Sequence, residues 1–186
     1  MTRSYTQQDP IEIAGGLNLY GFANGDPVNF HDPFGLSADT VKFTSAEAAE
    51  NLRAAVGNSE YFQWLYDIAN QDTRVYVFRE GDVPAPFLSG LTSIVLDNAT
   101  GRMLGARITI DPGDFALDSK VNGGLQITYG SVAGHEFGHI VGTIILEALG
   151  LPGICEEQCA RGFENGVRND LGLGRRDPVT GGRSRR

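Results

Sequence analysis

The stretch "GSVAGHEFGHIVG" at residues 130–142 constrains this chain more than any other feature. It contains His135, Glu136 and His139 in the order H-E-x-x-H. On an α-helix, residues four positions apart share one face about one turn apart, so both imidazoles can bind a single Zn²⁺. Glu136 lies beside the pair, where it can take a proton from a metal-bound water. We therefore predict a helix that carries a zinc site with its own general base, a combination suited to hydrolysis of amide bonds.

The residues around this motif are uncharged, which fits a helix buried on every side except the metal face. They are Val132, Ala133, Phe137, Gly138, Ile140 and Val141. The alternative is a core helix whose two histidines are only packed or hydrogen-bonded. We favour metal binding, because two histidines and an acid on an apolar helix carry a desolvation cost that a metal would offset.

The third ligand has to be a carboxylate. A catalytic zinc generally takes three protein ligands and leaves one position open for water. The metzincin pattern would place a third histidine at position 145, which is Ile145, and the remaining histidine, His31, lies in a different part of the chain. Glu147 follows His139 by eight residues, about 12 Å along the same helix, and cannot reach the same ion.

The next helix, expected over about 154–171, supplies the candidate carboxylates. Its glutamates are Glu156, Glu157 and Glu164. After the short connection "GLPG", an antiparallel return would bring the start of this helix beside the second half of the motif helix. A solvated charge at the helix start is the alternative interpretation of Glu156 and Glu157.

One stripe along this helix favours Glu157. The positions i, i+3, i+7 and i+11 are Glu157, Ala160, Glu164 and Arg168. With Glu157 as ligand, the small Ala160 leaves room for the metal. Glu164 would then orient a ligand histidine or pair with Arg168 at i+4.

The two cysteines, Cys155 and Cys159, are too few for a disulfide framework. Their i,i+4 spacing on a helix suits a disulfide poorly, so we expect reduced thiols and a cytosolic working environment. Ligation of the metal by a thiolate is an alternative, although Cys-x3-Cys is not a common zinc-binding spacing.

The chain changes character near Leu36. Residues 1–36 are rich in Gly, Asn and Asp-Pro pairs and predict short strands and tight turns, whereas helix signals begin after them. Ser45 and Ser59 are expected to cap the first two helices. The predicted helices are 46–56, 60–70, 130–149 and 154–171, and the predicted strands are 73–78, 91–97 and 103–111, with a loop over 112–128. This order predicts an α+β fold with a small sheet, in which the last two strands form a hairpin.

The segment "GARITID" at residues 105–111 has apolar residues at alternate positions. This pattern is that of an edge strand beside the motif helix, which could bind an extended substrate by main-chain pairing. A strand in the interior of the sheet explains the pattern equally well.

Charge and hydropathy exclude some classes of function. The net charge of −8 argues against nucleic-acid binding and favours cationic or neutral partners. Residues 175–186 hold five arginines and one aspartate without apolar anchors, and we expect a disordered basic tail there. No stretch is long and apolar enough to predict a membrane span, and the first residues lack the apolar middle region of a signal peptide.

The run "AGGLNLYGFANGDPVNFHDPFGL" resembles the end of the conserved core of Rhs proteins. Its last part matches P-x4-D-P-x-G-L, with Pro27, Asp32, Pro33, Gly35 and Leu36 at the fixed positions. In Rhs proteins this element marks where variable C-terminal toxin domains begin. The resemblance implies self-cleavage of the aspartyl type after Leu36, in which Asp32 and Asp9 would take part.

Residues 37–186, of which 37–174 would form the toxin domain, resemble the metallopeptidase toxins carried behind such cores and related injected effector peptidases. The match rests on "GHEFGH" and on the pattern E-x2-A-x3-E-N-x2-R, met by Glu157, Ala160, Glu164, Asn165 and Arg168. The resemblance implies a zincin-like fold of the gluzincin type, with one Zn²⁺ per chain. It makes His135, His139 and Glu157 the ligands, and Glu164, Asn165 and Arg168 the residues that support them. Relatives often have an aromatic residue after the final arginine as a transition-state donor; none follows Arg168 here, and Tyr129 is a candidate replacement.

The expected function is that of a secreted toxin that hydrolyses a protein in the cytoplasm of a target cell. Its partners would be the protein substrate, a cognate immunity protein, the Rhs core shell and a secretion apparatus. Two other functions stay open. One is a toxin or binding module in which the zinc is structural, and the other is an inactive displaced fragment.

Overall fold

The computed structural model describes residues 40–84, 88–151 and 153–177. The chain divides into two units, Met1–Thr40 and Val41–Arg186, and the described residues belong almost entirely to the second. The Rhs-like segment, with Asp9, Asp32 and Leu36, lies outside the described residues, as does most of the basic tail.

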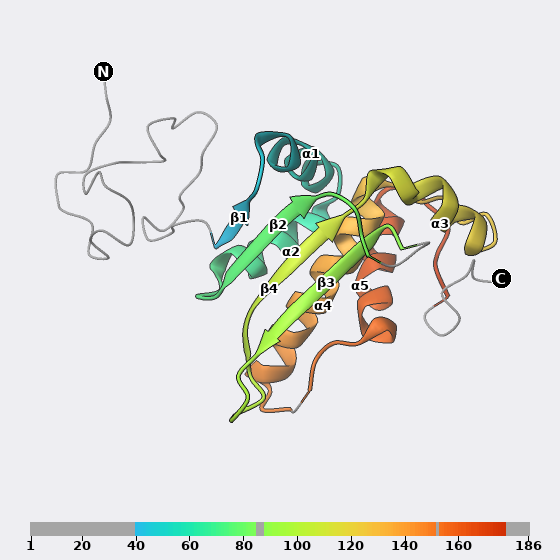
Figure 1. The fold of residues 1–186 in the computed structure, drawn as a ribbon. Coiled ribbons are helices and arrows are strands. Elements are labelled where there is room, and N and C mark those ends of the chain that lie inside the picture. Colours follow the sequence, from blue (N-terminus) through green and yellow to red (C-terminus); the bar gives the residue numbers. More distant parts are fainter. Residues whose placement is uncertain (1–39, 85–87, 152, 178–186) are drawn as a thin grey trace, which may run out of the picture. The chain divides into compact units, whose positions relative to one another are not determined.

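Within the described residues, the second unit is α+β, with a mixed four-stranded sheet and five α-helices. The elements, labelled as in Figure 1, are β1 (Val41–Phe43), α1 (Ala46–Gly57), α2 (Glu60–Gln71), β2 (Val75–Glu80), β3 (Gly90–Leu96), β4 (Met103–Ile110), the 3-10 turn η3 (Pro112–Asp114), α3 (Phe115–Val121), α4 (Tyr129–Ala148) and α5 (Glu157–Asp170). The four predicted helices and three predicted strands are all present, with ends that differ by no more than three residues. No described helix is long and apolar enough to cross a membrane.

Side-chain caps set the starts of the first helices, as the sequence predicts. The hydroxyl of Ser45 accepts a hydrogen bond from the amide of Ala48, and that of Ser59 accepts one from Phe62. Thr128 caps α4 in the same way. Each hydroxyl satisfies a backbone donor that has no partner within its helix.

The sheet has the strand order β1-β2-β4-β3. β2 pairs in parallel with β1 and β4, whereas β3 and β4 form the predicted antiparallel hairpin. Of the two interpretations of residues 105–111, the interior strand holds and the edge strand does not, because β4 pairs on both sides; β1 and β3 are the edge strands of the described sheet. Alternating apolar residues show which face of a strand is buried, but they do not show how many neighbours it has.

Three short elements were not predicted. The expected loop over 112–128 contains η3 and α3, which begin where the side chain of Asp111 accepts a hydrogen bond from the amide of Gly113. β1 is a three-residue strand. Both α3 and β1 are too short to show a clear period in the sequence.

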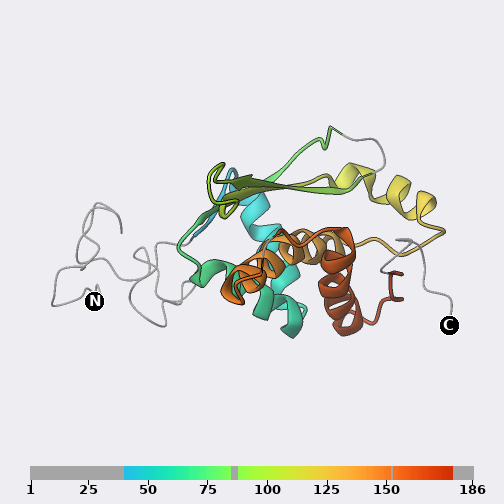
Figure 2. The same ribbon diagram turned by 90° about the horizontal axis from the view of Figure 1, so that it is seen from below.

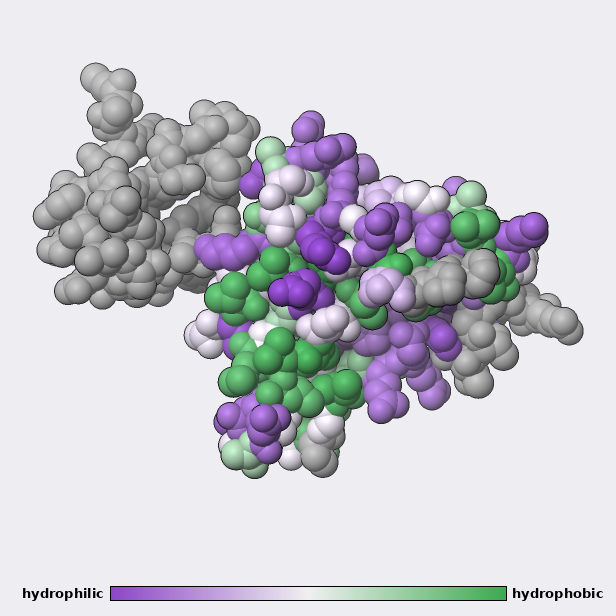
Figure 3. All heavy atoms as spheres, in the orientation of Figure 1, coloured by the Kyte–Doolittle hydropathy of each residue, from purple (hydrophilic) through white to green (hydrophobic). Residues whose placement is uncertain are grey.

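The sheet and the helices α1, α2, α4 and α5 form two layers, seen edge-on in Figure 2, with these helices on one face of the sheet and α3 beyond its end. The rings of Phe62, Phe78 and Phe137 meet between the layers and are fully buried. Apolar side chains are also exposed on the opposite face, where Val75 and Val95 lie in one row across Gly105, and Figure 3 shows an apolar patch on that face. The core therefore lies between sheet and helices, with α4 at its centre.

Glycines on α4 bring α5 unusually close. Gly134, Gly138 and Gly142 are four residues apart, so they share one face of the helix. A methyl group at any of them would overlap α5 or the segment that precedes it; the overlapped residues are Val167 for Gly134, Phe163 for Gly138 and Cys155 for Gly142. The order of these contacts shows that the two helices are antiparallel, as predicted, so the start of α5 lies beside the second half of α4.

Candidate metal centre

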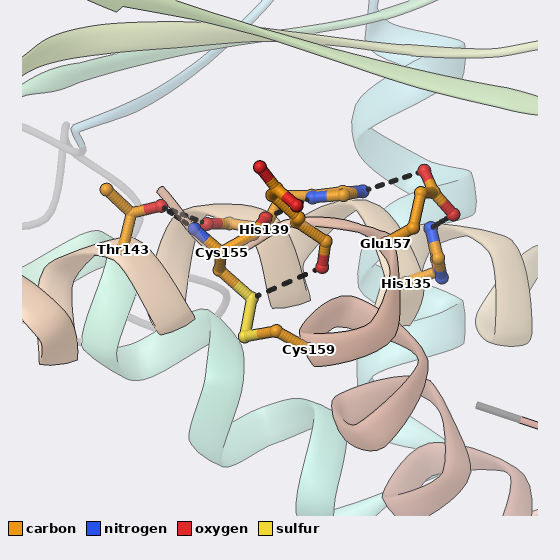
Figure 4. Close-up of a disulfide and its surroundings, with 7 residues drawn as sticks. His135, His139, Thr143, Cys155, Glu157 and Cys159 are labelled. Atoms are coloured by element: carbon orange, nitrogen blue, oxygen red, sulfur yellow. Dashed lines mark hydrogen bonds and ion pairs between the residues drawn. A yellow bond between two sulfur atoms is a disulfide. The ribbon is translucent and has the colours of Figure 1, made fainter. Parts of the chain in front are cut away.

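His135, His139 and Glu157 meet where the start of α5 lies against α4. The Nε2 atom of His135 lies 3.4 Å from Oε2 of Glu157, and Nε2 of His139 lies 3.5 Å from Oε1 of the same carboxylate. The three ligand atoms lie within 4.8 Å of one another. Figure 4 shows the carboxylate directed toward both rings. This group, which we call the His-His-Glu cluster, could hold a metal ion.

The other ring nitrogen of each histidine is already engaged. Nδ1 of His135 lies 3.1 Å from Oε2 of Glu164, and Nδ1 of His139 lies 2.6 Å from the carbonyl oxygen of Cys155. A carboxylate or carbonyl on one nitrogen of a histidine fixes the ring and leaves the other nitrogen for a metal. Two imidazole nitrogens and a carboxylate oxygen are also ligands that Zn²⁺ accepts. The residues present therefore fit a zinc ion.

Glu164 is held in place by two arginines. Its side chain is 1% exposed, and its carboxylate lies 3.1 Å from a guanidinium nitrogen of both Arg168 and Arg176. Burial opposes ionisation, but the hydrogen bond to His135 and the charges of the arginines hold the pKa of Glu164 below its ordinary value. Glu164 is therefore a charged group behind His135.

Arg168 and Asn165 tie this group to the chain around it. The guanidinium of Arg168 donates to the carbonyl oxygens of Gly174 and Gln126, at 2.6 and 2.8 Å. The side chain of Asn165 exchanges two hydrogen bonds with the backbone of Arg176, at 2.8 and 2.7 Å. The predicted supporting residues are thus brought together behind His135.

Arg176 corrects the prediction that the basic tail begins at residue 175. The sequence places Arg176 in a run of arginines without apolar anchors, which is typical of a solvated segment. In the structure it pairs with the buried Glu164, and its backbone is bound by Asn165. No local signal could show this, because both partners lie on α5, more than ten residues earlier.

Glu136 lies on the side of α4 that faces β3, away from Glu164 and α5. Its Oε2 accepts a hydrogen bond of 2.7 Å from the hydroxyl of Thr92, and a methyl group at Gly90 would overlap its carboxylate. Burial raises the pKa of Glu136, although the charges of His135 and His139 and the Thr92 hydrogen bond oppose this. Glu136 is therefore a carboxylate that takes up a proton more readily than an exposed one.

Glu136 shares a cavity of about 130 Å³ with the His-His-Glu cluster. His139 and Glu157 also line a larger hollow, of about 580 Å³, beside Ile94 and Leu96 of β3. The cluster therefore faces open space on the side of the edge strand.

Sequence reasoning did not single out Thr92 or Gly90. The signal available was the strand period, which places two residues separated by one position on the same face of β3. That face is the one turned toward α4, as the contacts of both residues with Glu136 show.

The structure does not bring Tyr129 to the cluster. Its hydroxyl is hydrogen-bonded to Glu80 at the end of β2, and its ring lies against Phe115. Burial and the neighbouring Glu80 raise the pKa of Tyr129. It lies six residues before His135, which places it on a different face of α4. We therefore do not retain Tyr129 as a transition-state donor.

The expectation that the two cysteines are reduced thiols is also wrong for this structure. Cys155 and Cys159 form a disulfide, with their Cα atoms 5.4 Å apart. The prediction assumed that both lie within one helix, but α5 begins at Glu157 and Cys155 precedes it. The extended approach to the helix gives the pair an ordinary separation for a disulfide.

Comparisons of the chain with protein-family models, curated proteins and solved structures find no match. What can be said of the site therefore follows from its own residues: a cluster able to hold a metal ion, a buried glutamate beside it, and a charged network behind one of its histidines.

Proposed function

We propose that this chain is a zinc-dependent peptidase with a zincin-like arrangement, in which His135, His139 and Glu157 hold one Zn²⁺ and Glu136 is the general base. The observation that carries the proposal is the cavity shared by the cluster and a buried glutamate. Metal ligands and a proton acceptor on one cavity are the two components that metal-assisted hydrolysis of an amide bond uses.

A bound Zn²⁺ would lower the pKa of its water and polarise the carbonyl group of the substrate. Glu136 would take the proton at its carboxylate and later deliver it to the leaving amine. Its raised pKa suits this exchange, because a proton acceptor works best when its pKa lies near the working pH. Thr92 holds one oxygen of the carboxylate, and the side chain of Glu136 lines the cavity.

The biological setting is proposed from the sequence resemblance alone. The Rhs-like segment and the toxin-like pattern support a role as the C-terminal toxin of a delivered Rhs protein. Such a toxin would cleave a protein in the cytoplasm of the target cell. The producing cell would then need a cognate immunity protein.

Replacement of Glu136 by Gln tests the proposal directly. We expect the variant to retain zinc, because Glu136 is not among the ligands, and to lose at least about 99% of its peptidase activity, as loss of a general base costs roughly 10²–10⁴-fold. Zinc content by elemental analysis and cleavage of unfolded protein substrates are the two measurements. Glu156→Gln, an exposed neighbour of Glu157, is the matched control and should retain both zinc and activity. A fully active Glu136→Gln variant that still holds zinc would rule the proposal out.

The alternative of a purely structural zinc needs a fourth protein ligand. Cys155 and Cys159 lie within two residues of Glu157 in the sequence, but their sulfur atoms are bonded to each other and are not thiolate ligands in this structure. A zinc-loaded chain that fails to cleave any protein and shows four protein ligands by X-ray absorption would favour this alternative. Failure of the purified chain to bind any metal would favour an inactive fragment.

A further inference from the structure

The Cys155–Cys159 disulfide lies beside the metal cluster, and the proposed chemistry does not use it. Figure 4 shows it below His139 and Glu157, at the junction between the connection and α5. Glu157 lies in the sequence between the two cysteines. A covalent link at this place encloses one of the three metal-facing residues in a short loop.

The main chain of Cys155 is fixed to α4. Its amide donates to the hydroxyl of Thr143 at 3.0 Å, and that hydroxyl donates to the carbonyl oxygen of His139 at 2.7 Å. Its carbonyl oxygen lies 2.6 Å from Nδ1 of His139. Cys155 therefore sets the orientation of a metal-facing histidine through its backbone.

The two glutamate side chains at the start of α5, by contrast, are weakly restrained. Glu156 occupies the cap position but makes no capping hydrogen bond with its side chain. The side chain of Glu157 is 62% exposed, and its ion pairs are with the two histidines and with Arg161 on its own helix. The disulfide is thus a second covalent connection, besides the peptide chain, between the fixed Cys155 and the helix turn that presents Glu157.

α4 is built to receive this disulfide. Both sulfur atoms lie close to Gly142, where even a methyl group would overlap the sulfur of Cys155. Cys155 is 1% exposed, whereas Cys159 is an exposed residue. The disulfide therefore joins a buried residue to one that is exposed at the surface, and solution approaches the bond from the side of Cys159.

We propose that the Cys155–Cys159 disulfide is a redox-sensitive clamp on the metal centre, which holds Glu157 and the His139 ring in their metal-binding positions until it is reduced. The inference rests on the metal-binding part of the proposed function. It does not depend on which reaction the metal serves.

Reduction by a dithiol proceeds in two exchanges. A thiolate of the dithiol attacks Sγ of Cys159, a mixed disulfide forms there, and Cys155 leaves as a thiolate that takes a proton. The second thiolate of the reagent then attacks its own sulfur in the mixed disulfide and releases Cys159. Two electrons pass to the protein, and the reagent leaves as its cyclic disulfide. In a reducing compartment the disulfide would therefore open with time, and the site would then bind its metal less tightly.

A Zn²⁺ titration of the metal-free full-length chain tests the clamp. The oxidised chain is compared with the chain after dithiol treatment and removal of the reagent without oxygen, with a chromogenic chelator as competitor. Thiol counting should give no free thiol before and two after reduction, because the chain has two cysteines. We expect reduction to weaken Zn²⁺ binding about 10-fold or more, the range seen when groups that support metal ligands are lost.

The double variant Cys155→Ala, Cys159→Ala is the matched control. It should bind Zn²⁺ as weakly as the reduced chain, and dithiol treatment should not change its affinity. The reduced wild-type chain carries the same test without any substitution, should the variant fail to fold. Circular dichroism establishes that the fold persists in each sample.

The possible results separate the clamp from the metal site itself. Equal Zn²⁺ affinity before and after reduction overturns the clamp and leaves the proposed function intact. Tighter binding after reduction also overturns it, since a freed thiolate would then be a ligand. Absence of Zn²⁺ binding in the oxidised chain overturns the metal site, and the clamp with it.

Discussion

Glu136 and Glu164 are both buried glutamates beside His135, but they have opposite surroundings. Glu136 faces β3, where its hydrogen-bond partner is the neutral hydroxyl of Thr92, and burial raises its pKa. Glu164 faces two arginines on the side of α5, and the pKa of its carboxyl is lowered despite burial.

The difference shows how one residue type can be assigned two tasks within one site. A carboxylate with a raised pKa can accept and return a proton, whereas one with a lowered pKa stays charged and can hold a ligand histidine. Environment therefore decides which glutamate is the candidate base and which is structural. Each of the following variants alters one side of this comparison.

Replacement of Arg168 by Met should have the largest effect. The guanidinium is fully buried and makes hydrogen bonds with Glu164, Gly174 and Gln126. Removal leaves the charge of Glu164 buried with one arginine fewer, and breaking a buried ion pair costs about 3–5 kcal/mol. We expect that loss in the free energy of unfolding, measured with urea. Arg175→Met, at an exposed neighbouring arginine, should change stability by less than about 0.5 kcal/mol. Similar effects of the two variants would mean that the network behind His135 is not a buried one.

The second variant, Glu164→Gln, should act on metal affinity. Its carboxylate holds Nδ1 of His135, and loss of such a partner weakens metal binding by roughly 10- to 100-fold. Competition with a zinc chelator measures the change in the folded variant. Affinity equal to that of the wild-type chain would show that Glu164 supports the fold but not the metal.

Glu136→Gln should have the opposite sign on stability. The folded-state pKa of Glu136 is raised above its ordinary value of 4.5, so the folded chain ionises it less readily than the unfolded chain does. Ionisation therefore favours unfolding, and the wild-type chain loses stability as the pH rises through the window above 4.5. In metal-free protein, the variant should be more stable than wild type at pH 7, because the neutral amide of Gln carries no buried charge. Urea unfolding at pH 4 and pH 7 checks this, because the two proteins should converge at the lower pH.

A smaller effect is expected when Thr92 is replaced by Val. The variant removes the hydrogen bond that lowers the pKa of Glu136, so that pKa should rise further. We expect the acid limb of the pH–rate profile to move to higher pH and the peptidase rate at pH 7 to fall by about tenfold, the loss of one hydrogen bond to a charged group. Ser93→Ala, at the exposed neighbour on β3, is the control. A lower rate without a shift in the profile would assign Thr92 a structural role.

The roles expected for Glu136 and Glu164 could be predicted from the sequence, because they depend on the periodicity of helices. The spacing of His135 and His139, and the stripe that begins at Glu157, place residues on one face without knowledge of the rest of the fold. The glycines of α4 also repeat every four residues, and this spacing indicates a close contact with another helix.

The remainder depends on long-range contacts that no local pattern contains. Thr92 meets Glu136 because β3 lies beside β4 at one edge of the sheet, and strand order cannot be read from alternation. Whether the two cysteines can form a disulfide depends on where α5 begins, and periodicity defines the ends of a helix poorly. Arg176 reaches Glu164 only because the chain turns back after α5.

The smallest effect is expected at the C-terminal end of α4, which carries the ion pair between Arg74 and Glu147 but no histidine. There the carboxylate of Glu147 accepts hydrogen bonds from the guanidinium of Arg74 and the amide of Met103. Burial opposes ionisation, but these two partners lower the pKa of Glu147, so its contribution to stability is present above its ordinary value of 4.5 and is lost as the pH falls through the lowered folded-state pKa.

Glu147→Gln should therefore cost about 1 kcal/mol or less at pH 7, as is usual for partly exposed pairs, and less still at acid pH. Urea unfolding across this pH range measures the stability, and the zinc titration should give the wild-type affinity, since this pair touches none of the metal-facing residues. Glu164→Gln and Glu147→Gln thus form a matched pair on one helix bundle. If both weakened zinc binding equally, the loss would come from general loosening of α4, and the assignment of Glu164 to His135 would fail.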